Sequence, residues 1–223
     1  MTHKRSKIEW IQILNKATAG HRPAAVDVYN SSFADAIDLE HHGLLQQSTR
    51  LLDLGCGNGR LAVALTESTL LQSYNGVDPV IESIEFCKWA FAPYERVFNF
   101  QWIDVFNEYY TPNGGDDPAQ FKLPFAPEQF DTVVASSLFT HLGSAEVCRN
   151  YLTEIHRVLA NDGKLFCSWF RSPPNEPSSR VLRTVLSEAA IITMVTELFE
   201  VFHSRGGFTK DFNDQWCLYA RKK

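Results

Sequence analysis

The stretch DLGCGNGR, residues 53–60, decides the fold class, because it joins an apolar run to a helical pattern through three glycines. RLLDL at 50–54 has the composition of a short buried strand, and GRLAVALTES at 59–68 has helical spacing. Glycine permits a tight turn between such elements and lets a ligand approach the backbone. The glycine spacing is G-x-G-x-G, whereas the dinucleotide fingerprint is G-x-G-x-x-G and needs its third glycine where Arg60 stands. The stretch therefore predicts a ligand-binding turn between a strand and a helix.

Strand and helix patterns alternate along the rest of the chain. We predict strands over 50–54, 74–78, 98–104, 130–137, 164–170, 199–204 and 216–221. We predict helices over 7–19, 25–46, 59–68, 80–92, 145–159 and 178–197. Such alternation is typical of a parallel sheet covered by helices, and no helix separates the last two strands. We therefore expect an α/β fold with a doubly wound, mostly parallel seven-stranded sheet, helices on both faces and a C-terminal antiparallel β-hairpin.

The length of 223 residues suits one α/β domain with a small addition. We expect an N-terminal helical cap over residues 1–49 and the main domain over residues 50–223. Prolines and glycines crowd the segment 107–128, which predicts an irregular insertion in the main domain. The dipeptide Asp162-Gly163 predicts a turn into the fifth strand.

Composition narrows the class of partner. The chain is 44% hydrophobic, which excludes a largely disordered protein, and its net charge of −5 does not favour nucleic-acid binding. The five cysteines are odd in number and include no C-x-x-C pair, so we expect neither a metal site nor a disulfide framework. No apolar run is long enough to span a membrane, and a reducing cytoplasmic setting is the default. We expect a small-molecule partner, no nucleic acid or membrane, and a monomer or homodimer.

Polar residues stand where three further strands end. Ligands of open α/β sheets bind beyond the carboxyl ends of the strands. Asp78 ends the second predicted strand, where a carboxylate can accept hydrogen bonds from both hydroxyls of a ribose. Asp104 ends the third strand, in position to meet an adenine edge, and the fourth ends in DTVVASSL at 131–138. Either aspartate alone could simply cap the following helix, but their common position on successive strands favours one nucleoside site.

Five segments in this order resemble the class I S-adenosylmethionine-dependent methyltransferases, from their first motif through their fifth. They are LLDLGCGNGRLAVAL (51–65), YNGVDPVIESIEFCK (74–88), FQWIDVF (100–106), FDTVVASSLFTHL (130–142) and YLTEIHRVLANDGKLFCSWF (151–170). SLFTHL and YLTEIHRVL resemble a bacterial subgroup that acts on small molecules. The resemblance covers about residues 50–170, and the terminal hairpin extends it. It implies S-adenosylmethionine as cofactor and S-adenosylhomocysteine as product.

The resemblance assigns roles in the first motif. Gly55 and Gly57 would approach the methionine and ribose parts of the cofactor. Asp53, below them, would support the cofactor's amino group. Cys56 lies within the same predicted cofactor-binding turn, where we expect it to serve packing, because methyl transfer requires no thiol nucleophile.

The resemblance also assigns roles beyond the first motif. Asp78 would hold the ribose hydroxyls, and Pro79, which follows it, belongs to the predicted cofactor site. Asp104 and the backbone of Val105 would bind adenine, and Ser136 would line the methionyl side. One departure is the turn Asp162-Gly163, where many relatives have Pro-Gly, and it affects nothing catalytic.

Two residues are candidates for a catalytic role. His141, after the fourth strand, is the best candidate for a general base, and its alternative role is to anchor the loop or lie near the adenosyl group. Tyr29 lies in the N-terminal segment that folds over the cofactor pocket in many relatives, and its alternative role is a packed helix aromatic. Tyr109 and Tyr110 open the insertion, which could form a wall of the acceptor site, a lid or a solvated loop.

The leading hypothesis is an enzyme that methylates an oxygen, nitrogen or carbon of a small molecule by in-line transfer. A nicotinamide-dependent dehydrogenase is disfavoured by the glycine spacing and the terminal hairpin. A non-catalytic protein that binds S-adenosylmethionine or S-adenosylhomocysteine for regulation stays open, because the sequence does not identify the acceptor. A protein or RNA methyltransferase is disfavoured, since the fourth strand leads into Ser-Ser-Leu-Phe at 136–139 and not Asn/Asp-Pro-Pro-aromatic.

Overall fold

A computed structural model describes residues 4–18, 24–170, 184, 186–206 and 215–223. The chain divides into two compact units, Met1–Ile103 and Asp104–Lys223. Its seven strands follow the order β3-β2-β1-β4-β5-β7-β6. Within the units β1 pairs with β2, β2 with β3, and β4 with β5 in parallel, while β7 runs antiparallel to both β5 and β6. The predicted α/β class, with a mostly parallel sheet that closes in an antiparallel hairpin, is confirmed.

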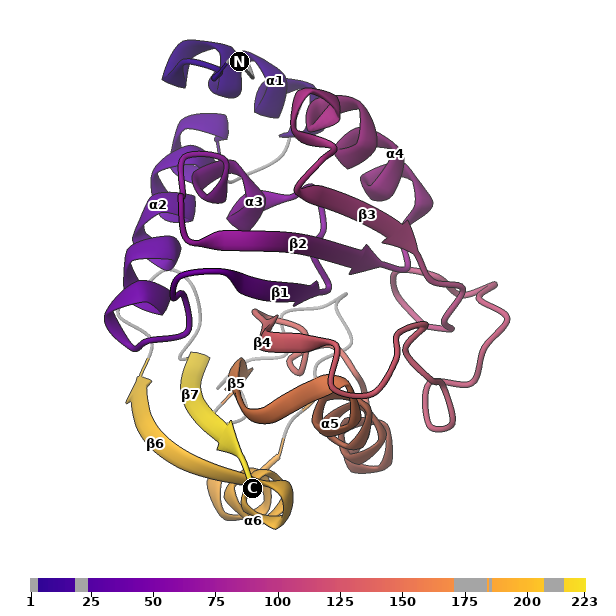
Figure 1. Cartoon of the computed structure of the whole chain (residues 1–223). Coiled ribbons are helices and arrows are strands. Elements are labelled where there is room, and N and C mark those ends of the chain that lie inside the picture. Colours follow the sequence, from indigo (N-terminus) through magenta and orange to yellow (C-terminus); the bar gives the residue numbers. More distant parts are fainter. Residues whose placement is uncertain (1–3, 19–23, 171–183, 185, 207–214) are drawn as a thin grey trace. The chain divides into compact units, whose positions relative to one another are not determined.

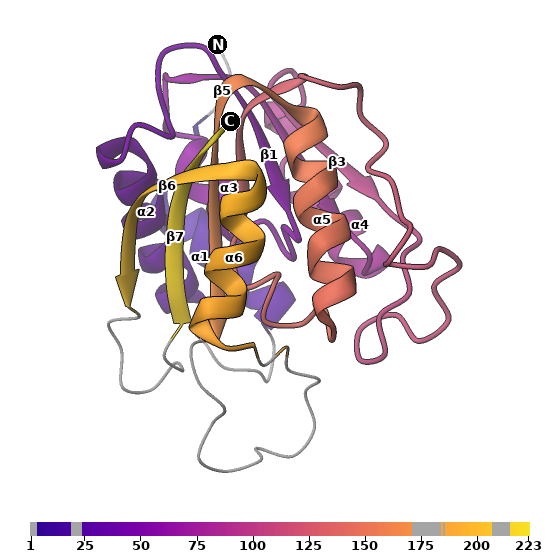
Figure 2. The ribbon, with the colours of Figure 1, turned by 90° about the horizontal axis from the view of Figure 1, so that it is seen from below.

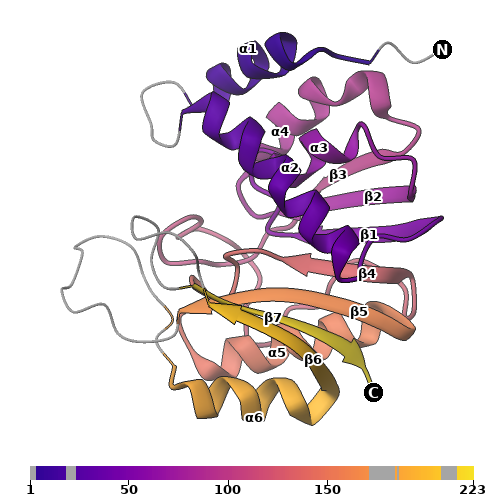
Figure 3. The same cartoon turned by 90° about the vertical axis from the view of Figure 1, so that its left-hand side faces the viewer.

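In the first unit, the residues that the structure describes form three parallel strands and four α-helices (Figure 1). They are α1 Lys7–Thr18, α2 Ala25–His41, β1 Thr49–Leu54, α3 Arg60–Leu65, β2 Leu71–Asp78, α4 Ile81–Ala90, a 3₁₀ turn Ala92–Tyr94 and β3 Phe98–Trp102. Helix α2 packs against both α1 and α3 (Figure 3). The predicted cap at 1–49 and its boundary stay a prediction; in the structure α1 and α2 belong to the same compact unit as β1–β3.

An aromatic cluster fastens α1 to the rest of this unit. Trp10 is 1% exposed, and its ring lies 4.9 Å from that of Phe91. Phe91 in turn lies 5.8 Å from Phe98 and 5.0 Å from Phe100, both on β3. Rings at these distances bury a large apolar area and attract one another further through their quadrupoles. The cluster therefore leaves little room for Phe91 to move.

The described residues of the second unit form four strands and two helices. They are β4 Phe130–Ala135, α5 Ala145–Val158, β5 Leu159–Phe170, α6 Glu188–Leu198, β6 Phe199–Gly206 and β7 Gln215–Lys222. Helices α5 and α6 lie side by side over these strands (Figure 2). The segment 107–128 is a loop without helix or strand, as the sequence predicts (Figure 1).

The loop 107–128 is nevertheless firmly attached to α5. Arg157 donates hydrogen bonds to the carbonyl oxygens of Phe125 and Leu123, at 2.7 and 2.9 Å. Glu154, paired with Arg157 at 2.6 Å, accepts a hydrogen bond from Leu123 N at 2.8 Å. Burial opposes ionisation of Glu154, but the hydrogen bonds from Arg157 and Leu123 outweigh it and lower its pKa.

Several element boundaries differ from the sequence-based prediction. Helix α2 ends at His41 and not at 46, because Gly43, at φ 70°, and Leu44 donate to the carbonyls of Glu40 and Leu39 and close the last turn. Strand β2 begins at Leu71 and not at 74. Residues 71–73 have only a weak strand pattern in sequence, but the pairing of Leu71 with Thr49 of β1 makes them part of the sheet.

Helix α6 begins at Glu188, after Ser187 accepts a hydrogen bond from Ala190 N at 3.2 Å. The earlier part of the predicted helix 178–197 falls largely outside the described residues. The predicted turn at Asp162-Gly163 is wrong, because both residues lie within β5 and not before it. Leu159 pairs with Phe130 and Lys164 with Thr132, so four residues, 160–163, form a bulge opposite one.

Candidate functional site

The glycine turn between β1 and α3 needs glycine for its backbone. Gly55, Gly57 and Gly59 have φ of 80°, 51° and 75°, a region that side chains with a Cβ disfavour. The amides of Gly55 and Cys56 donate to the carbonyl oxygen of Val77 at 2.9 and 3.0 Å. The turn is thus fastened to the end of β2.

Gly57 and Gly59 differ in what surrounds them. A Cβ on Gly59 would meet Phe91 Cε2 at 2.8 Å and Cys87 Sγ at 3.1 Å, so this glycine serves close packing of the turn against α4 and its end. A Cβ on Gly57 would meet nothing within 4 Å. There is consequently open space beside the backbone of Gly57, as a ligand that approaches the turn requires.

The carboxylate of Asp78 lies against this same glycine. Its Oδ2 accepts a hydrogen bond from Gly57 N at 2.8 Å, and its Oδ1 accepts one from Val80 N at 2.9 Å. The residue is 7% exposed, and burial raises its pKa although the two backbone N–H groups act to lower it. Each carboxylate oxygen keeps a further lone pair for a donor such as a ribose hydroxyl. Pro79, next along, accepts a hydrogen bond from Trp102 Nε1 at 2.8 Å through its carbonyl oxygen.

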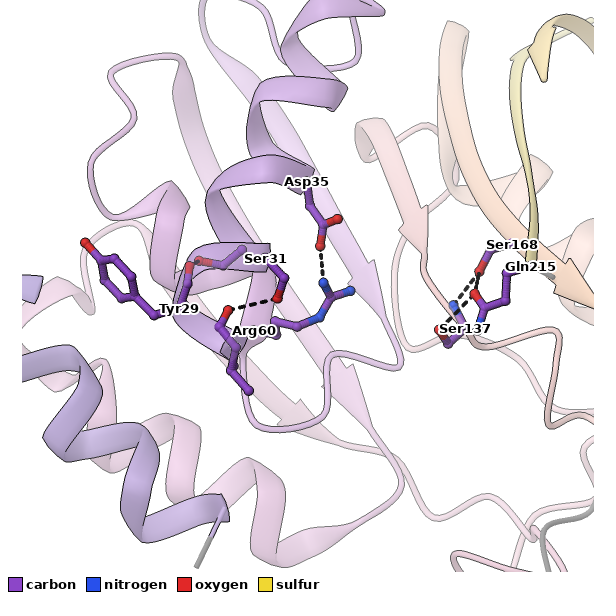
Figure 4. Close-up of polar contacts among 9 residues, drawn as sticks. Tyr29, Ser31, Asp35, Arg60, Ser137, Ser168 and Gln215 are labelled. Atoms are coloured by element: carbon purple, nitrogen blue, oxygen red, sulfur yellow. Dashed lines mark hydrogen bonds and ion pairs between the residues drawn. The ribbon is translucent and has the colours of Figure 1, made fainter. Parts of the chain in front are cut away.

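Asp53 is a buried acid near the end of β1. It is 4% exposed and accepts a 2.5 Å hydrogen bond from Tyr74 Oη on β2. Burial raises its pKa to about 6, against the opposing effects of that hydrogen bond and of the Arg60 charge. Arg60 itself forms an ion pair with Asp35 of α2 (Figure 4). A cationic amino group beside Asp53 would offset the cost of its ionisation.

Cys56 has the packing role that the sequence analysis expects of it. Its thiol is 6% exposed and fills the space beside Gly76, where a Cβ would come within 2.9 Å of Cys56 Sγ. A hydrogen bond to the Cys87 thiol and burial raise the pKa of Cys56 well above its ordinary value. The Cys87 thiol points to Gly57 O at 3.3 Å. An enclosed thiol whose pKa is raised is a poor nucleophile, so Cys56 supports the turn.

In the second unit, Asp104 and Val105 lie where the loop 107–128 begins. Asp104 is exposed; its Oδ1 accepts a hydrogen bond from Gly115 N at 3.1 Å, and its carbonyl oxygen accepts one from Asp116 N at 2.8 Å. Val105 is buried, and a Cβ on Gly114 would come within 2.4 Å of its carbonyl oxygen. The loop therefore folds back on these two residues, an arrangement that no sequence pattern indicates. Their contact with adenine stays a prediction.

His141 lies in the loop that follows β4. Its carbonyl oxygen accepts a hydrogen bond from Asn107 Nδ2 at 3.0 Å, and its ring stands perpendicular to that of Tyr110 at 5.5 Å. Asn107 Oδ1 also accepts hydrogen bonds from the amides of Tyr109 and Tyr110, at 3.1 and 3.0 Å. Asn107 was not singled out from sequence, yet it joins the loop 107–128 to the segment that carries His141. A role for His141 as base stays a prediction.

Tyr29 lies on α2 with a partly exposed side chain. Its ring is 4.9 Å from that of Phe33, and Lys7 Nζ lies 5.2 Å from the ring. Burial, and then the charge of Glu67, raise the pKa of the phenol. Tyr29 is therefore better suited to donate a hydrogen bond than to act as a base, and its contact with cofactor or substrate stays a prediction.

The described residues show neither a metal-binding group nor a membrane-spanning helix. They contain no group of three His, Cys, Asp or Glu residues that could hold a metal ion. Among the helices in that part of the chain, none is both long and apolar enough to cross a membrane.

Solved structures with the same fold are numerous and distant in sequence. A SAM-dependent methyltransferase from Methanosarcina mazei is 18% identical over 82% of this chain and 96% of that one, with a TM-score of 0.63. The N-methyltransferase NodS of Bradyrhizobium japonicum, solved with S-adenosyl-L-homocysteine, is 16% identical over 95% of this chain and 97% of its own, with a TM-score of 0.63. The cyclase SpnF is 16% identical over 95% of this chain and 92% of its own, with a TM-score of 0.64.

The family itself follows from the sequence match. A family described as a methyltransferase domain matches residues 52–167, just over half of the chain. The chain belongs to this family, the class I SAM-dependent methyltransferases, and its cofactor is S-adenosylmethionine. The open space at Gly57 beside the Asp78 carboxylate fits a nucleoside cofactor.

Proposed function

We propose that this protein is an enzyme that transfers a methyl group from S-adenosylmethionine to an oxygen, nitrogen or carbon of a small molecule. The observation that carries the choice of acceptor is the segment after β4. It offers Ser136 and Ser137, small neutral side chains, in a chain of net charge −5. An enzyme that methylates a large polyanion would be expected to carry many basic residues. An enzyme that methylates a planar amine would be expected to have a Pro-Pro-aromatic motif in the segment after β4.

The cofactor supplies a methyl group that is already activated on a sulfonium, so the chain's own residues bind and orient. Gly57 leaves room beside the turn, and Asp78 offers acceptor lone pairs to the ribose hydroxyls. Asp53, supported by Tyr74, offers a buried negative charge to the amino group. His141, in the second unit, would accept a proton where the acceptor is an alcohol.

Binding and transfer are tested in two steps. Saturation with S-adenosylhomocysteine at about a hundred times its dissociation constant stabilises the folded state by about 2.7 kcal/mol, a rise in Tm of roughly 5–10 °C for a chain of this size. An equal concentration of NAD should leave Tm unchanged. No shift with S-adenosylhomocysteine would contradict the binding site.

The second step follows the label from methyl-labelled S-adenosylmethionine. The protein is incubated with a deproteinised metabolite extract, with total tRNA and with bulk protein in separate reactions. We expect label in the metabolite fraction only. Label in tRNA or protein would contradict a small acceptor.

The structurally similar SpnF is a cyclase, so this fold alone does not imply methyl transfer. A non-catalytic binding protein is the second candidate. Binding of S-adenosylhomocysteine with no label in any fraction would favour this second candidate over transfer.

A further inference from the structure

Three neutral polar side chains converge just beyond the carboxyl end of β4. Ser137 follows the strand, Ser168 lies on β5 and Gln215 is the first residue of β7 (Figure 4). Ser168 Oγ accepts a hydrogen bond from Ser137 N at 2.7 Å and donates one to Gln215 Oε1 at 2.9 Å. Ser137 Oγ lies 3.2 Å from Gln215 Oε1 and 3.1 Å from Gln215 Nε2. We call these three residues the Ser-Ser-Gln cluster.

A count of hydrogens shows which donor of the cluster is left for a ligand. The three side chains carry four polar hydrogens: one on each serine and two on the glutamine amide. The Ser168 hydrogen goes to Gln215 Oε1. The Ser137 hydroxyl donates to Gln215 Oε1 and accepts from Gln215 Nε2, which uses two further hydrogens. One donor hydrogen, the second on Gln215 Nε2, is left without a partner among the residues that the structure describes.

Burial separates a supporting residue from the two that can reach a ligand. Ser168 is 1% exposed and fixes the glutamine amide from below. Ser137 and Gln215 are both partly exposed, and Gln215 carries the remaining hydrogen. An uncharged N–H donor fits the lone pair of a ketone, ester or amide carbonyl, or of one oxygen of a carboxylate.

The backbone at Ser137 points to the same conclusion. Its φ of 59° lies in the left-handed region, where serine is strained and glycine is not. A serine there retains a hydroxyl at the cost of local strain. Ser137 also follows Ser136, the residue predicted to line the methionyl side of the cofactor.

We propose that Gln215, positioned by Ser137 and Ser168, donates a hydrogen bond from its amide to a carbonyl or carboxylate oxygen of the methyl acceptor. This inference rests on the proposed function, because it takes the ligand of the cluster to be the acceptor and not the cofactor. It defines the substrate class as small molecules that carry an oxygen acceptor group, such as a carbonyl or a carboxylate.

Three aromatic probes of similar size test this chemistry on the full chain saturated with S-adenosylhomocysteine. Acetophenone and benzoate present an oxygen acceptor, whereas benzylamine at neutral pH presents only donors. Titrations followed by saturation-transfer NMR give their affinities. We expect acetophenone and benzoate to bind about tenfold more tightly than benzylamine. Equal or tighter binding of benzylamine would overturn the proposal.

Two variants locate the binding within the cluster. Gln215→Glu keeps the shape and replaces the donating NH₂ with an oxygen, while Ser168 can still donate to the side chain. We expect it to weaken both benzoate and acetophenone by about tenfold or more. Ser137→Gly removes the hydroxyl at a position where glycine is unstrained, so it should weaken both probes without lowering Tm. Gln72→Glu, an exposed residue of β2, makes the same charge change elsewhere and should alter neither affinity.

The affinity for S-adenosylhomocysteine separates this proposal from the proposed function. We expect calorimetry to give the same affinity for the wild type, Gln215→Glu and Ser137→Gly. A loss confined to the variants would assign the cluster to the cofactor and overturn the inference, as would probe affinities that neither variant changes. Failure of the wild type to bind S-adenosylhomocysteine would instead overturn the proposed function, and the probe titrations on the free protein would still test the cluster.

Discussion

Alanine at Gly57 and alanine at Gly59 should have opposite consequences, although both glycines lie in one turn with positive φ. In Gly59→Ala the left-handed backbone costs about 1 kcal/mol. The new methyl would also lie 2.8 Å from Phe91 Cε2, and overpacking of this kind costs about 1–3 kcal/mol. Because Phe91 is held by Trp10 and Phe100, the ring cannot move aside easily. We expect Tm to fall by roughly 5–15 °C.

In Gly57→Ala only the backbone cost applies, since nothing lies within 4 Å of the new Cβ. Tm should fall by about 2–4 °C. The methyl would, however, occupy the space through which the cofactor approaches, and we expect affinity for S-adenosylhomocysteine to fall at least about tenfold, or about 1.4 kcal/mol. Gly59→Ala, while folded, should bind within about twofold of the wild type.

Differential scanning calorimetry measures Tm. Titration calorimetry measures the affinity for S-adenosylhomocysteine at 20 °C, roughly the temperature of maximum stability. The two variants are each other's control, because both add one methyl to the same turn. If Gly57→Ala lost as much stability as Gly59→Ala, or bound S-adenosylhomocysteine as the wild type does, the open space beside Gly57 would not be a ligand site.

Three further predictions concern charged residues. Asp78→Ala should weaken S-adenosylhomocysteine by about 1–3 kcal/mol through lost charged hydrogen bonds, and calorimetry that shows unchanged affinity would refute the ribose assignment. The folded pKa of Asp53, about 6, lies above its ordinary value of 3.8, so the folded state holds this proton more tightly and stability falls as pH rises between the two values. Asp53→Asn should therefore be more stable than the wild type by up to about 3 kcal/mol at pH 7 and equal to it near pH 4. Denaturant melts of the cofactor-free protein measure this difference, and a difference independent of pH would contradict the prediction. Arg157→Met leaves the buried Glu154 without its partner and frees Leu123 O, and should lower Tm by about 4–8 °C, with proteolysis in the loop 107–128 as a second readout.

The features that could be predicted from sequence are those set by local patterns. The glycine turn, the strands on either side of it and Asp78 at the end of β2 each depend on a few consecutive residues. The irregular loop at 107–128 follows from its prolines and glycines. These signals do not require knowledge of which strands are neighbours, because parallel strands with intervening helices bring their carboxyl ends to one edge of a sheet.

The contacts that could not be predicted join distant parts of the chain through register. Gln215 meets Ser137, 78 positions away, because β7 pairs with β5 in a register that sets Gln215 opposite Phe170. The sequence pattern of β7 does not distinguish this register from one shifted by two residues, because such a shift leaves every side chain on the same face of the sheet. Asn107 reaches His141 across 34 positions through a loop without periodicity, and Tyr74 reaches Asp53 across adjacent strands.

The residues that break the usual rules of stability are the ones with candidate roles in binding. Asp53 is an acid buried at the cost of a raised pKa, and Ser137 is a serine in a glycine conformation. Each would be improved for folding alone, by asparagine at 53 or glycine at 137. A cationic amino group beside Asp53 and an oxygen acceptor beside Ser137 would remove the reason for each penalty, because the first restores the ionised acid and the second uses the hydroxyl. We expect Asp53→Asn and Ser137→Gly each to stabilise the free protein. If the first weakens only S-adenosylhomocysteine and the second only the oxygen acceptor, the lower stability of the wild type at each position is the cost of a separate binding function.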